Sequence, residues 1–182
     1  MIYLIAGSSH TGKTWLAQKM MEKCHYPYFS IDHLKMGLIR SGYCTLSPES
    51  SDEELTACLW PVVREMIKTA VENGQSMIIE GIYIPFDYQQ DFEPAYLPQI
   101  QFWCLVFSEE YITYHYNRIM EYENVIEQRL CSPGDDVSLP LLVADNLKNI
   151  QECRRYNCNY ILIEEAYNIN AMADRILASA VI

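Results

Sequence analysis

The chain has 182 residues, of which 50% are hydrophobic and 20% are charged. This length and composition predict one globular domain, residues 1–182, with a buried core. Thirteen Lys and Arg residues against twenty-four Asp and Glu residues give a net charge of −11. Because such a charge repels nucleic acid backbones and anionic membranes, we expect no nucleic acid partner and no membrane partner.

Seven cysteines occur in the chain, and none of them forms a C-x-x-C pair. The chain opens on an apolar run without a basic leader segment. We therefore expect a cytoplasmic, reducing setting in which most thiols fill core space rather than bind zinc.

The apolar run 2–6 predicts a strand, and the segment after it fits the pattern G-x-x-x-x-G-K-[ST]. This phosphate loop consists of Gly7, Ser8, Ser9, His10, Thr11, Gly12, Lys13 and Thr14. Its glycines permit a tight turn around phosphate oxygens, and its N–H groups and the following helix N-terminus favour anions. The motif predicts ATP bound with Mg²⁺, with Lys13 on the β- and γ-phosphates and the Thr14 hydroxyl on the metal.

Further along the chain, apolar periodicity and turn signals predict strands that alternate with helices. The expected helices are residues 14–23, 34–39, 53–72, 109–120, 139–156 and 171–180. The expected strands after the first are residues 28–31, 76–80, 101–107 and 160–163. This alternation predicts an α/β fold with a five-stranded parallel sheet. Together with the phosphate-loop motif, it leads us to expect a three-layer P-loop NTPase fold with a short helical lid.

Asp32 follows the second expected strand, nineteen residues after Lys13. Ligands of parallel α/β sheets bind beyond the carboxyl ends of the strands, so Asp32 should face the γ-phosphate. We interpret Asp32 as a substrate binder or general base that orients an acceptor hydroxyl for in-line transfer. An alternative, compatible role is the N-cap of a helix that begins at His33.

Glu80 ends the third expected strand, in the run Ile78-Ile79-Glu80-Gly81. An acid after a buried apolar strand is typical of Walker B strands, so we expect Glu80 to hold Mg²⁺ directly or through water. The alternative is that Glu80 only pairs with a nearby Lys or Arg.

Two arginines, Arg118 and Arg129, bracket a polar segment that could fold over bound phosphates as a lid at about residues 118–130. Such arginines neutralise charge on a transferred phosphoryl group. Alternatively, they pair with the neighbouring carboxylates Glu121, Glu123 and Glu127.

The region of about residues 32–72 is the expected acceptor-binding region. Lys35, Arg40 and Arg64 could hold an anionic group of the acceptor, and Trp60 and Tyr83 could wall its pocket. The alternatives are an ordinary solvated face for the cations and core positions for the aromatic residues.

The pattern resembles the small P-loop kinases, a group that includes adenylate kinase, shikimate and gluconate kinases, chloramphenicol phosphotransferase and the zeta toxins. The resemblance covers nearly the whole chain. Segment 30–35 is similar to the acceptor-binding segment, segment 80–85 to the D-G-F-P-R of adenylate kinase, and segment 123–130 to its distal lid segment. Arg118 matches the first lid arginine.

Lys35 and Phe86 stand where adenylate kinases place arginines for AMP. The acid after the second strand is instead similar to the base by which chloramphenicol phosphotransferases and zeta toxins activate a hydroxyl. The resemblance thus implies that a hydroxyl is the acceptor.

We therefore expect an ATP- and Mg²⁺-dependent phosphotransferase that moves the γ-phosphoryl group to a small-molecule acceptor, as a monomer or small homo-oligomer. Two alternatives stay open: a nucleoside monophosphate kinase, and a regulatory nucleotide-binding switch with slow hydrolysis. Neither an N-K-x-D nor a switch-like D-x-x-G motif is present to support a GTPase-type switch.

Overall fold

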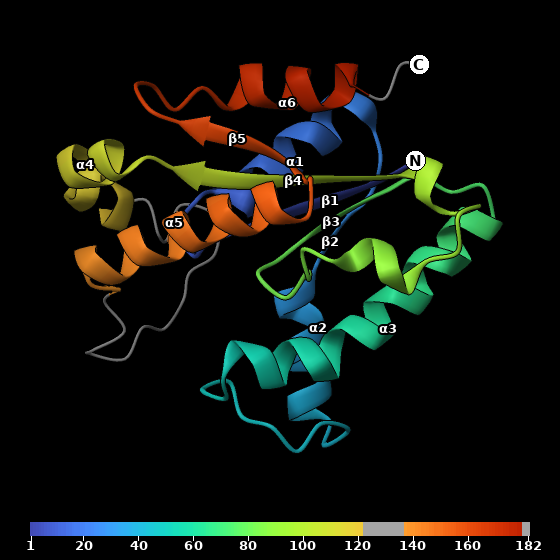
Figure 1. Ribbon diagram of the computed structural model, residues 1–182. Coiled ribbons are helices and arrows are strands. Elements are labelled where there is room, and N and C mark those ends of the chain that lie inside the picture. The colour runs from blue at the N-terminus through green and yellow to red at the C-terminus, as the bar shows by residue number, and fades with distance from the viewer. Residues whose placement is uncertain (122–136, 180–182) are drawn as a thin grey trace.

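The computed structural model describes residues 1–121 and 137–179, and its centre is a five-stranded parallel sheet (Figure 1). The strands lie in the order β2-β3-β1-β4-β5. They are β1 (Ile2–Gly7), β2 (Tyr28–Ser30), β3 (Met77–Glu80), β4 (Ile100–Phe107) and β5 (Asn159–Ile163). The predicted α/β fold with a five-stranded parallel sheet is therefore confirmed.

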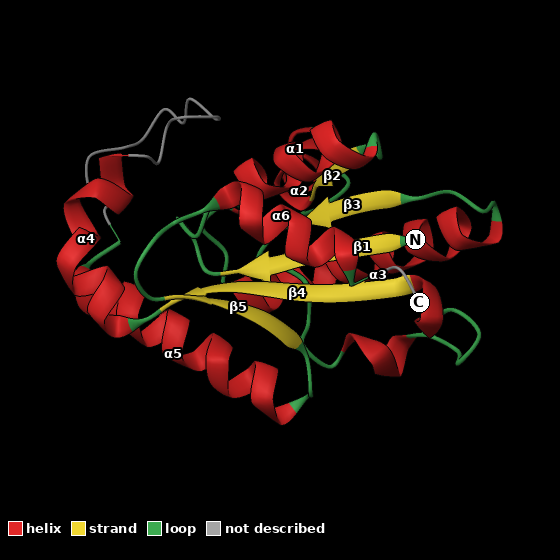
Figure 2. Ribbon diagram, turned by 90° about the horizontal axis from the view of Figure 1, so that it is seen from above, coloured by secondary structure: helices red, strands yellow, loops and turns green. Residues whose placement is uncertain are grey.

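Helices cover both faces of this sheet, as the view from above also shows (Figure 2). The α-helices are α1 (Lys13–Cys24), α2 (Ile31–Arg40), α3 (Asp52–Glu72), α4 (Glu109–Glu121), α5 (Leu139–Arg155) and α6 (Ile169–Ala178). Two short 3₁₀ helices, η1 (Tyr88–Asp91) and η2 (Leu97–Gln99), lie between β3 and β4.

The central strand β1 divides the core into two layers because its side chains alternate between the faces of the sheet. Tyr3 and Ile5 pack in the cluster that includes the buried faces of α1 and α6. Ile2 and Leu4 pack in the cluster formed with α3 and the segment after β3. All six residues of β1 are buried, as is typical of a strand covered on both sides.

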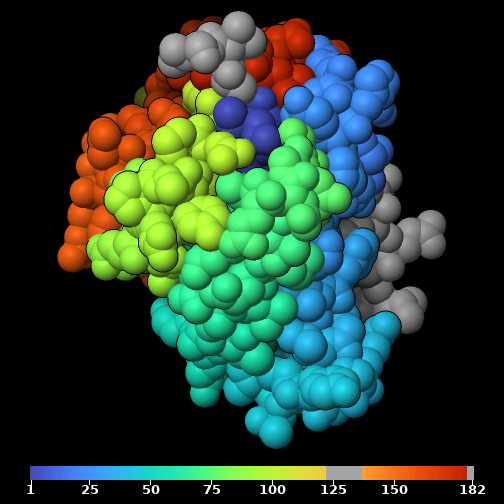
Figure 3. Space-filling view, turned by 90° about the vertical axis from the view of Figure 1, so that its right-hand side faces the viewer, coloured from blue at the N-terminus to red at the C-terminus, as the bar shows by residue number. Residues whose placement is uncertain are grey.

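The segment between β3 and β4 packs along α3, and these two parts form one face of the molecule (Figure 3). Trp60 of α3 lies edge-on to Phe92 of this segment, with ring centroids 6.2 Å apart. The Tyr96 hydroxyl donates a 2.7 Å hydrogen bond to the carboxylate of Glu72. This packing covers the face of the sheet on which α3 lies.

Helix α2 begins at Ile31, three residues earlier than expected, with Ser30 as its N-cap residue. Asp32 therefore lies inside the first turn, and its predicted alternative role as the N-cap is wrong. The reason is burial: Ile31 is fully buried, and a Cβ at Gly81 would lie 3.0 Å from the Cβ of Ile31. The chain enters the helix directly from β2 in order to place Ile31 against Gly81.

Helix α3 shows the start that its sequence indicates. Ser51 and Glu54 form a reciprocal capping box, in which each side chain accepts a hydrogen bond from the backbone N–H of the other. The remaining element boundaries agree with expectation to within about two residues, which is the usual uncertainty of helix and strand ends.

Helix α5 is fastened to the end of β4 by Asn146, whose side chain is fully buried. Its Oδ1 accepts a 2.8 Å hydrogen bond from the backbone N–H of Phe107, and its Nδ2 donates a 2.8 Å hydrogen bond to the Leu142 carbonyl. This amide satisfies a strand-end donor that would otherwise be buried without a partner.

We predict that Asn146→Ala lowers the free energy of unfolding by about 1–3 kcal/mol, because the buried Phe107 N–H loses its acceptor. Urea unfolding followed by circular dichroism measures the change. Gln151→Ala, an exposed position on the same helix, is the matched control and should change stability by less than about 0.5 kcal/mol. Equal stability of the two variants would contradict this role of Asn146.

Candidate functional site

The phosphate loop leaves the central strand through a turn that only glycine can make at two positions. Gly7 has φ 141°, and a Cβ on it would lie 2.5 Å from the Leu105 carbonyl oxygen of β4. Gly12 has φ 80°, and a Cβ there would lie 2.0 Å from the hydroxyl of Tyr167. At Gly7 the backbone conformation and the close backbone neighbour therefore exclude a side chain, whereas at Gly12 an added Cβ would be strained by the positive φ and would have to displace Tyr167.

The loop is held by hydrogen bonds from within and from two other parts of the chain. Within it, Lys13 Nζ donates to the Ser8 carbonyl oxygen at 2.7 Å, and Thr11 Oγ1 donates to the same oxygen at 2.8 Å. From α5, Asn149 Nδ2 donates to Ser8 Oγ at 2.8 Å. From the connection between β5 and α6, the Tyr167 hydroxyl donates to the Thr11 carbonyl at 3.0 Å.

These contacts leave a loop that is suited to anions. Helix α1 begins at Lys13, so the first N–H groups of the helix and the positive end of its dipole lie at the loop. Lys13 is almost fully buried, and it places a positive charge inside the loop. Thr14 follows in the first turn of α1. Of the eight predicted phosphate-loop residues, Gly7 thus ends β1, residues 8–12 form the turn, and Lys13 and Thr14 begin α1.

Glu80 and Ser30 end two adjacent strands on the side of the sheet that α1 covers. Ser30 pairs in register with Glu80, and Glu80 pairs with Ile5. Because Ile5 and Ile78 pack in the cluster with α1, and side chains two residues apart share a face, Glu80 points to that face as well. Both side chains are buried, and Ser30 Oγ has no hydrogen-bond partner among the described residues.

The side chains of Ser30 and Glu80 therefore provide hard oxygen donors on the face of the sheet that α1 covers, which is the chemistry that Mg²⁺ prefers. Among residues 1–121 and 137–179, no group of three or more His, Cys, Asp or Glu side chains could hold a metal ion. Mg²⁺ commonly binds through one or two carboxylates together with phosphate oxygens. Thr14, Ser30 and Glu80 fit that mode, and Ser30 is an addition to the residues predicted from the sequence.

Asp32, Lys35 and Tyr83 form one connected cluster beyond β2 and β3. Lys35 Nζ lies 2.8 Å from Asp32 Oδ1 and donates a 2.9 Å hydrogen bond to the Tyr83 hydroxyl. The same ammonium group lies 5.2 Å from the centre of the Tyr83 ring. Three of the predicted acceptor-binding residues are thus in contact.

Burial and the neighbouring polar groups shift the pKa values of Lys35 and Tyr83 in opposite directions. Burial acts to lower the pKa of Lys35, but its hydrogen bonds to Asp32 and Tyr83 and the negative charge of Asp32 raise the pKa above the ordinary value. Burial raises the pKa of Tyr83, although the bond from Lys35 acts to lower it. At neutral pH the cluster therefore contains an ammonium group and a protonated phenol beside the carboxylate.

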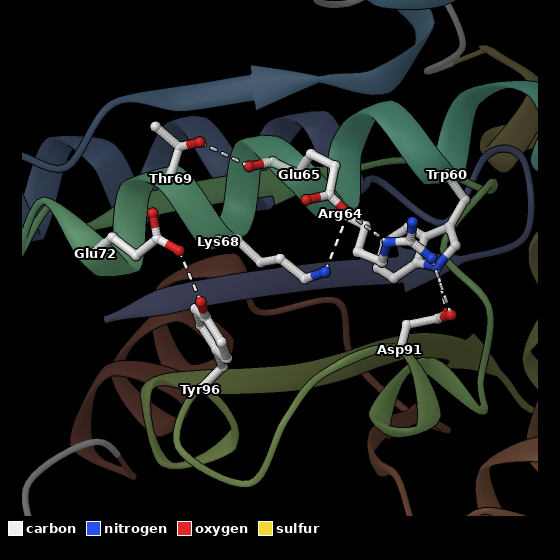
Figure 4. Close-up of polar contacts among 8 residues, drawn as sticks. All are labelled: Trp60, Arg64, Glu65, Lys68, Thr69, Glu72, Asp91 and Tyr96. Carbon is white, nitrogen blue, oxygen red and sulfur yellow. Dashed lines mark hydrogen bonds and ion pairs between the residues drawn. The ribbon is translucent and has the colours of Figure 1, made fainter.

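The polar groups of Trp60 and Arg64 lie along the contact between α3 and η1 (Figure 4). Trp60 Nε1 donates a 2.7 Å hydrogen bond to Asp91 Oδ2, and Arg64 Nη1 lies 3.3 Å from Asp91 Oδ1. Arg64 Nε also lies 2.9 Å from Glu65. The polar groups of both residues thus hold η1 against α3. Arg40, the last residue of α2, is exposed.

Arg118 lies in the last turn of α4, which follows β4. Arg129 and most of the predicted lid lie outside the described residues.

Sequence reasoning missed Tyr167 and Asn149, although Tyr167 follows the end of β5 and so lies at the edge where ligands bind in parallel sheets. No helix in the described part of the chain is long and apolar enough to cross a membrane.

Solved structures share this arrangement of strands and helices. A candidate kinase from Chloroflexus aurantiacus matches with a TM-score of 0.60 and 16% identity, over 97% of this chain and 96% of that chain. A gluconokinase from Sinorhizobium meliloti matches with a TM-score of 0.56 and 15% identity, over 98% and 90%. A shikimate kinase from Aquifex aeolicus matches with a TM-score of 0.52 and 16% identity, over 98% and 95%.

No protein-family model matches the chain, and no curated protein is significantly similar to it in sequence. The structural similarity confirms the expected resemblance at the level of fold: the chain has the fold of the P-loop small-molecule kinases.

Gly12→Ala tests the contact between the phosphate loop and Tyr167. Gly42 has a similar φ of 78° but no atom within 4 Å of an added Cβ, so Gly42→Ala measures the conformational cost alone. We expect Gly42→Ala to lower the free energy of unfolding by about 1–2 kcal/mol. Gly12→Ala should cost clearly more in the same urea titration, since it also displaces Tyr167. Equal losses would mean that Tyr167 is not packed on Gly12.

The raised pKa of Lys35 predicts how stability depends on pH. The stabilisation from its charge should be complete below the unfolded-state pKa of about 10.4 and should be lost as pH rises through the higher folded-state pKa. The difference in unfolding free energy between the wild type and Lys35→Met should therefore be constant from about pH 7 to 9.5 and shrink above that. A difference that already disappears near pH 8 would contradict the geometry of the cluster. Lys19→Met is the control, because the amine of Lys19 pairs with the exposed Glu22.

Proposed function

We propose that the chain is an ATP- and Mg²⁺-dependent phosphotransferase that moves the γ-phosphoryl group to a hydroxyl of a small-molecule acceptor. One observation supports this proposal above the others. A glycine-bounded phosphate loop with a buried lysine follows β1, and a carboxylate fixed by Lys35 follows β2, which β3 separates from β1, so both lie at the same edge of one parallel sheet. Phosphoryl transfer depends mainly on such positioning and on electrostatic stabilisation.

In the proposed mechanism, the loop N–H groups and Lys13 bind the terminal phosphates. Lys13 exchanges its hydrogen bond to the Ser8 carbonyl for phosphate oxygens and stabilises the charge that develops on the transferred group. Thr14, Ser30 and Glu80 are the residues that would hold Mg²⁺. When bound, the metal neutralises charge on the β- and γ-phosphate oxygens.

Asp32 acts on the acceptor. Its carboxylate accepts the hydrogen bond of the acceptor hydroxyl and takes the proton as the new oxygen–phosphorus bond forms. The bond between the γ-phosphorus and its bridging oxygen breaks, and its electrons leave on ADP. Lys35 and Tyr83 position Asp32, because the Lys35 ammonium group contacts both side chains.

A hydroxyl acceptor is favoured over a nucleoside monophosphate by the ion pairs of the acceptor-binding region. Three of the four cations in residues 32–72 pair with carboxylates: Lys35 with Asp32, Arg64 with Asp91 and Glu65, and Lys68 with Glu65. An acceptor phosphate would compete with these carboxylates for its cations. The similar folds also include a gluconokinase, a shikimate kinase and a sugar kinase, whose names specify small molecules.

The test is coupled ADP release from Mg²⁺-ATP against a panel of hydroxyl acceptors, with nucleoside monophosphates included. We predict that one acceptor class stimulates ADP release, that Asp32→Asn lowers kcat by about 10²- to 10⁴-fold, and that ATP affinity is nearly unchanged. Lys13→Met should lose activity as well.

Glu53→Gln, an exposed carboxylate in the first turn of α3, is the control and should retain full activity. Slow ADP release that no acceptor stimulates and that Asp32→Asn leaves unchanged would overturn the proposal and favour a nucleotide-binding switch. The cytoplasmic setting and the monomeric or small homo-oligomeric state stay predictions from the sequence.

A further inference from the structure

An exposed tryptophan lies directly after the phosphate loop. Trp15 follows Thr14 in the first turn of α1, and 39% of its surface is exposed. The other two tryptophans, Trp60 and Trp103, are each only 6% exposed because they pack in the core. Trp15 thus presents a large apolar surface to solvent beside a site that we expect to bind a nucleotide.

The indole of Trp15 is held in place relative to the loop by Tyr167. The two rings stack with centroids 5.6 Å apart and an interplanar angle of 10°. Tyr167 in turn donates its hydroxyl hydrogen to the Thr11 carbonyl and lies against Gly12. The aromatic pair and the phosphate loop are therefore one connected unit.

Further aromatic contacts extend this unit toward α4. The ring centroids of Tyr167 and of Phe107, at the end of β4, lie 6.2 Å apart. Phe107 in turn stacks on Tyr111 of α4, with ring centroids 5.0 Å apart. These contacts brace Tyr167 from the side of the sheet. Because these contacts fix Tyr167, the Trp15 ring that stacks on it is already ordered for contact with a ligand, although it is exposed.

A flat, uncharged aromatic surface suits the base of a nucleotide, which is itself flat and uncharged. Aromatic side chains stack on nucleobases, and this contact does not require a positive field, which a chain of net charge −11 lacks. Lys13 and Thr14 face the phosphates in the proposed mechanism, and Trp15 is the next residue along the helix. We infer that Trp15, backed by Tyr167, is the platform on which the base of the bound nucleotide stacks.

This inference rests on the proposed function, because it needs a nucleotide at the phosphate loop. Stacking area depends on the size of the base, so purine nucleotides gain more from the platform than pyrimidine nucleotides. Trp15 then contributes to the choice of nucleotide, while the loop binds the phosphates that all nucleoside triphosphates share.

The test compares a ligand that has a base with one that lacks it. Calorimetric titrations measure the binding of Mg²⁺-ATP and of Mg²⁺-tripolyphosphate to the wild type, Trp15→Ala and Trp15→Phe. We expect Trp15→Ala to weaken ATP binding at least tenfold and to leave tripolyphosphate binding within twofold. Trp15→Phe should retain most of the ATP affinity, because it keeps an aromatic face.

Wild-type fluorescence provides a second readout that needs no alanine variant. ATP should quench the emission of Trp15, tripolyphosphate should not, and the quench should vanish in Trp15→Phe, where Trp60 and Trp103 remain. The wild type should also bind ATP and GTP more tightly than CTP and UTP, and Trp15→Ala should reduce that preference.

Equal loss of ATP and tripolyphosphate binding in Trp15→Ala would overturn the inference, because it would show that Trp15 only supports the loop. Unchanged ATP binding in Trp15→Ala would overturn it as well. A wild type that binds tripolyphosphate and ATP equally well, without quenching, rejects the platform but leaves the phosphate site intact. A wild type that binds neither ligand rejects the proposed function and this inference together.

Discussion

The turn by which the chain leaves β1 is the constraint on which the rest of the site depends. β1 is the central strand, and Gly7 at its end lies so close to the Leu105 carbonyl of β4 that no side chain fits. This close approach brings α1 back over the sheet, with Lys13 at its first residue. Strand register places Glu80 and Ser30 side by side at the ends of β3 and β2. The site is thus a consequence of one tight connection between a buried strand and a helix.

The phosphate loop provides local positive charge in a chain whose net charge is negative. A net charge of −11 opposes the approach of a triphosphate, yet the phosphate loop combines a helix N-terminus with a buried lysine. The carboxylate of Asp32 would add repulsion near the same edge, and its pairing with Lys35 offsets that charge. In the proposed mechanism Lys35 thereby allows a base to lie close to the phosphates, because a paired carboxylate repels an anion less than an isolated one. In the proposed mechanism, Mg²⁺ would offset the negative charge of Glu80 in the same way.

The sequence predicted local features well and long-range contacts poorly. The apolar runs of β1, β3 and β4 and the phosphate loop were recognisable because strand burial and glycine turns leave local patterns. The contact of Lys35 with Asp32 follows from helical spacing. In contrast, the contacts of Trp60 and Arg64 with Asp91 were not predicted, because no local pattern indicates the position of Asp91, and the role of Trp60 and Arg64 in acceptor binding stays a prediction. Ser30, Asn149 and Tyr167 were missed for the same reason: each reaches the site through strand register or through packing between distant segments.

The measurement that tests the account most directly is ³¹P nuclear magnetic resonance of Mg²⁺-ATP with the protein and an acceptor mixture. It identifies the product of the γ-phosphoryl group, which ADP release alone does not. Our account predicts a new phosphomonoester signal that grows in proportion to ADP and is absent with Asp32→Asn. Inorganic phosphate as the sole product, at a rate that Asp32→Asn does not change, would contradict phosphoryl transfer to a hydroxyl.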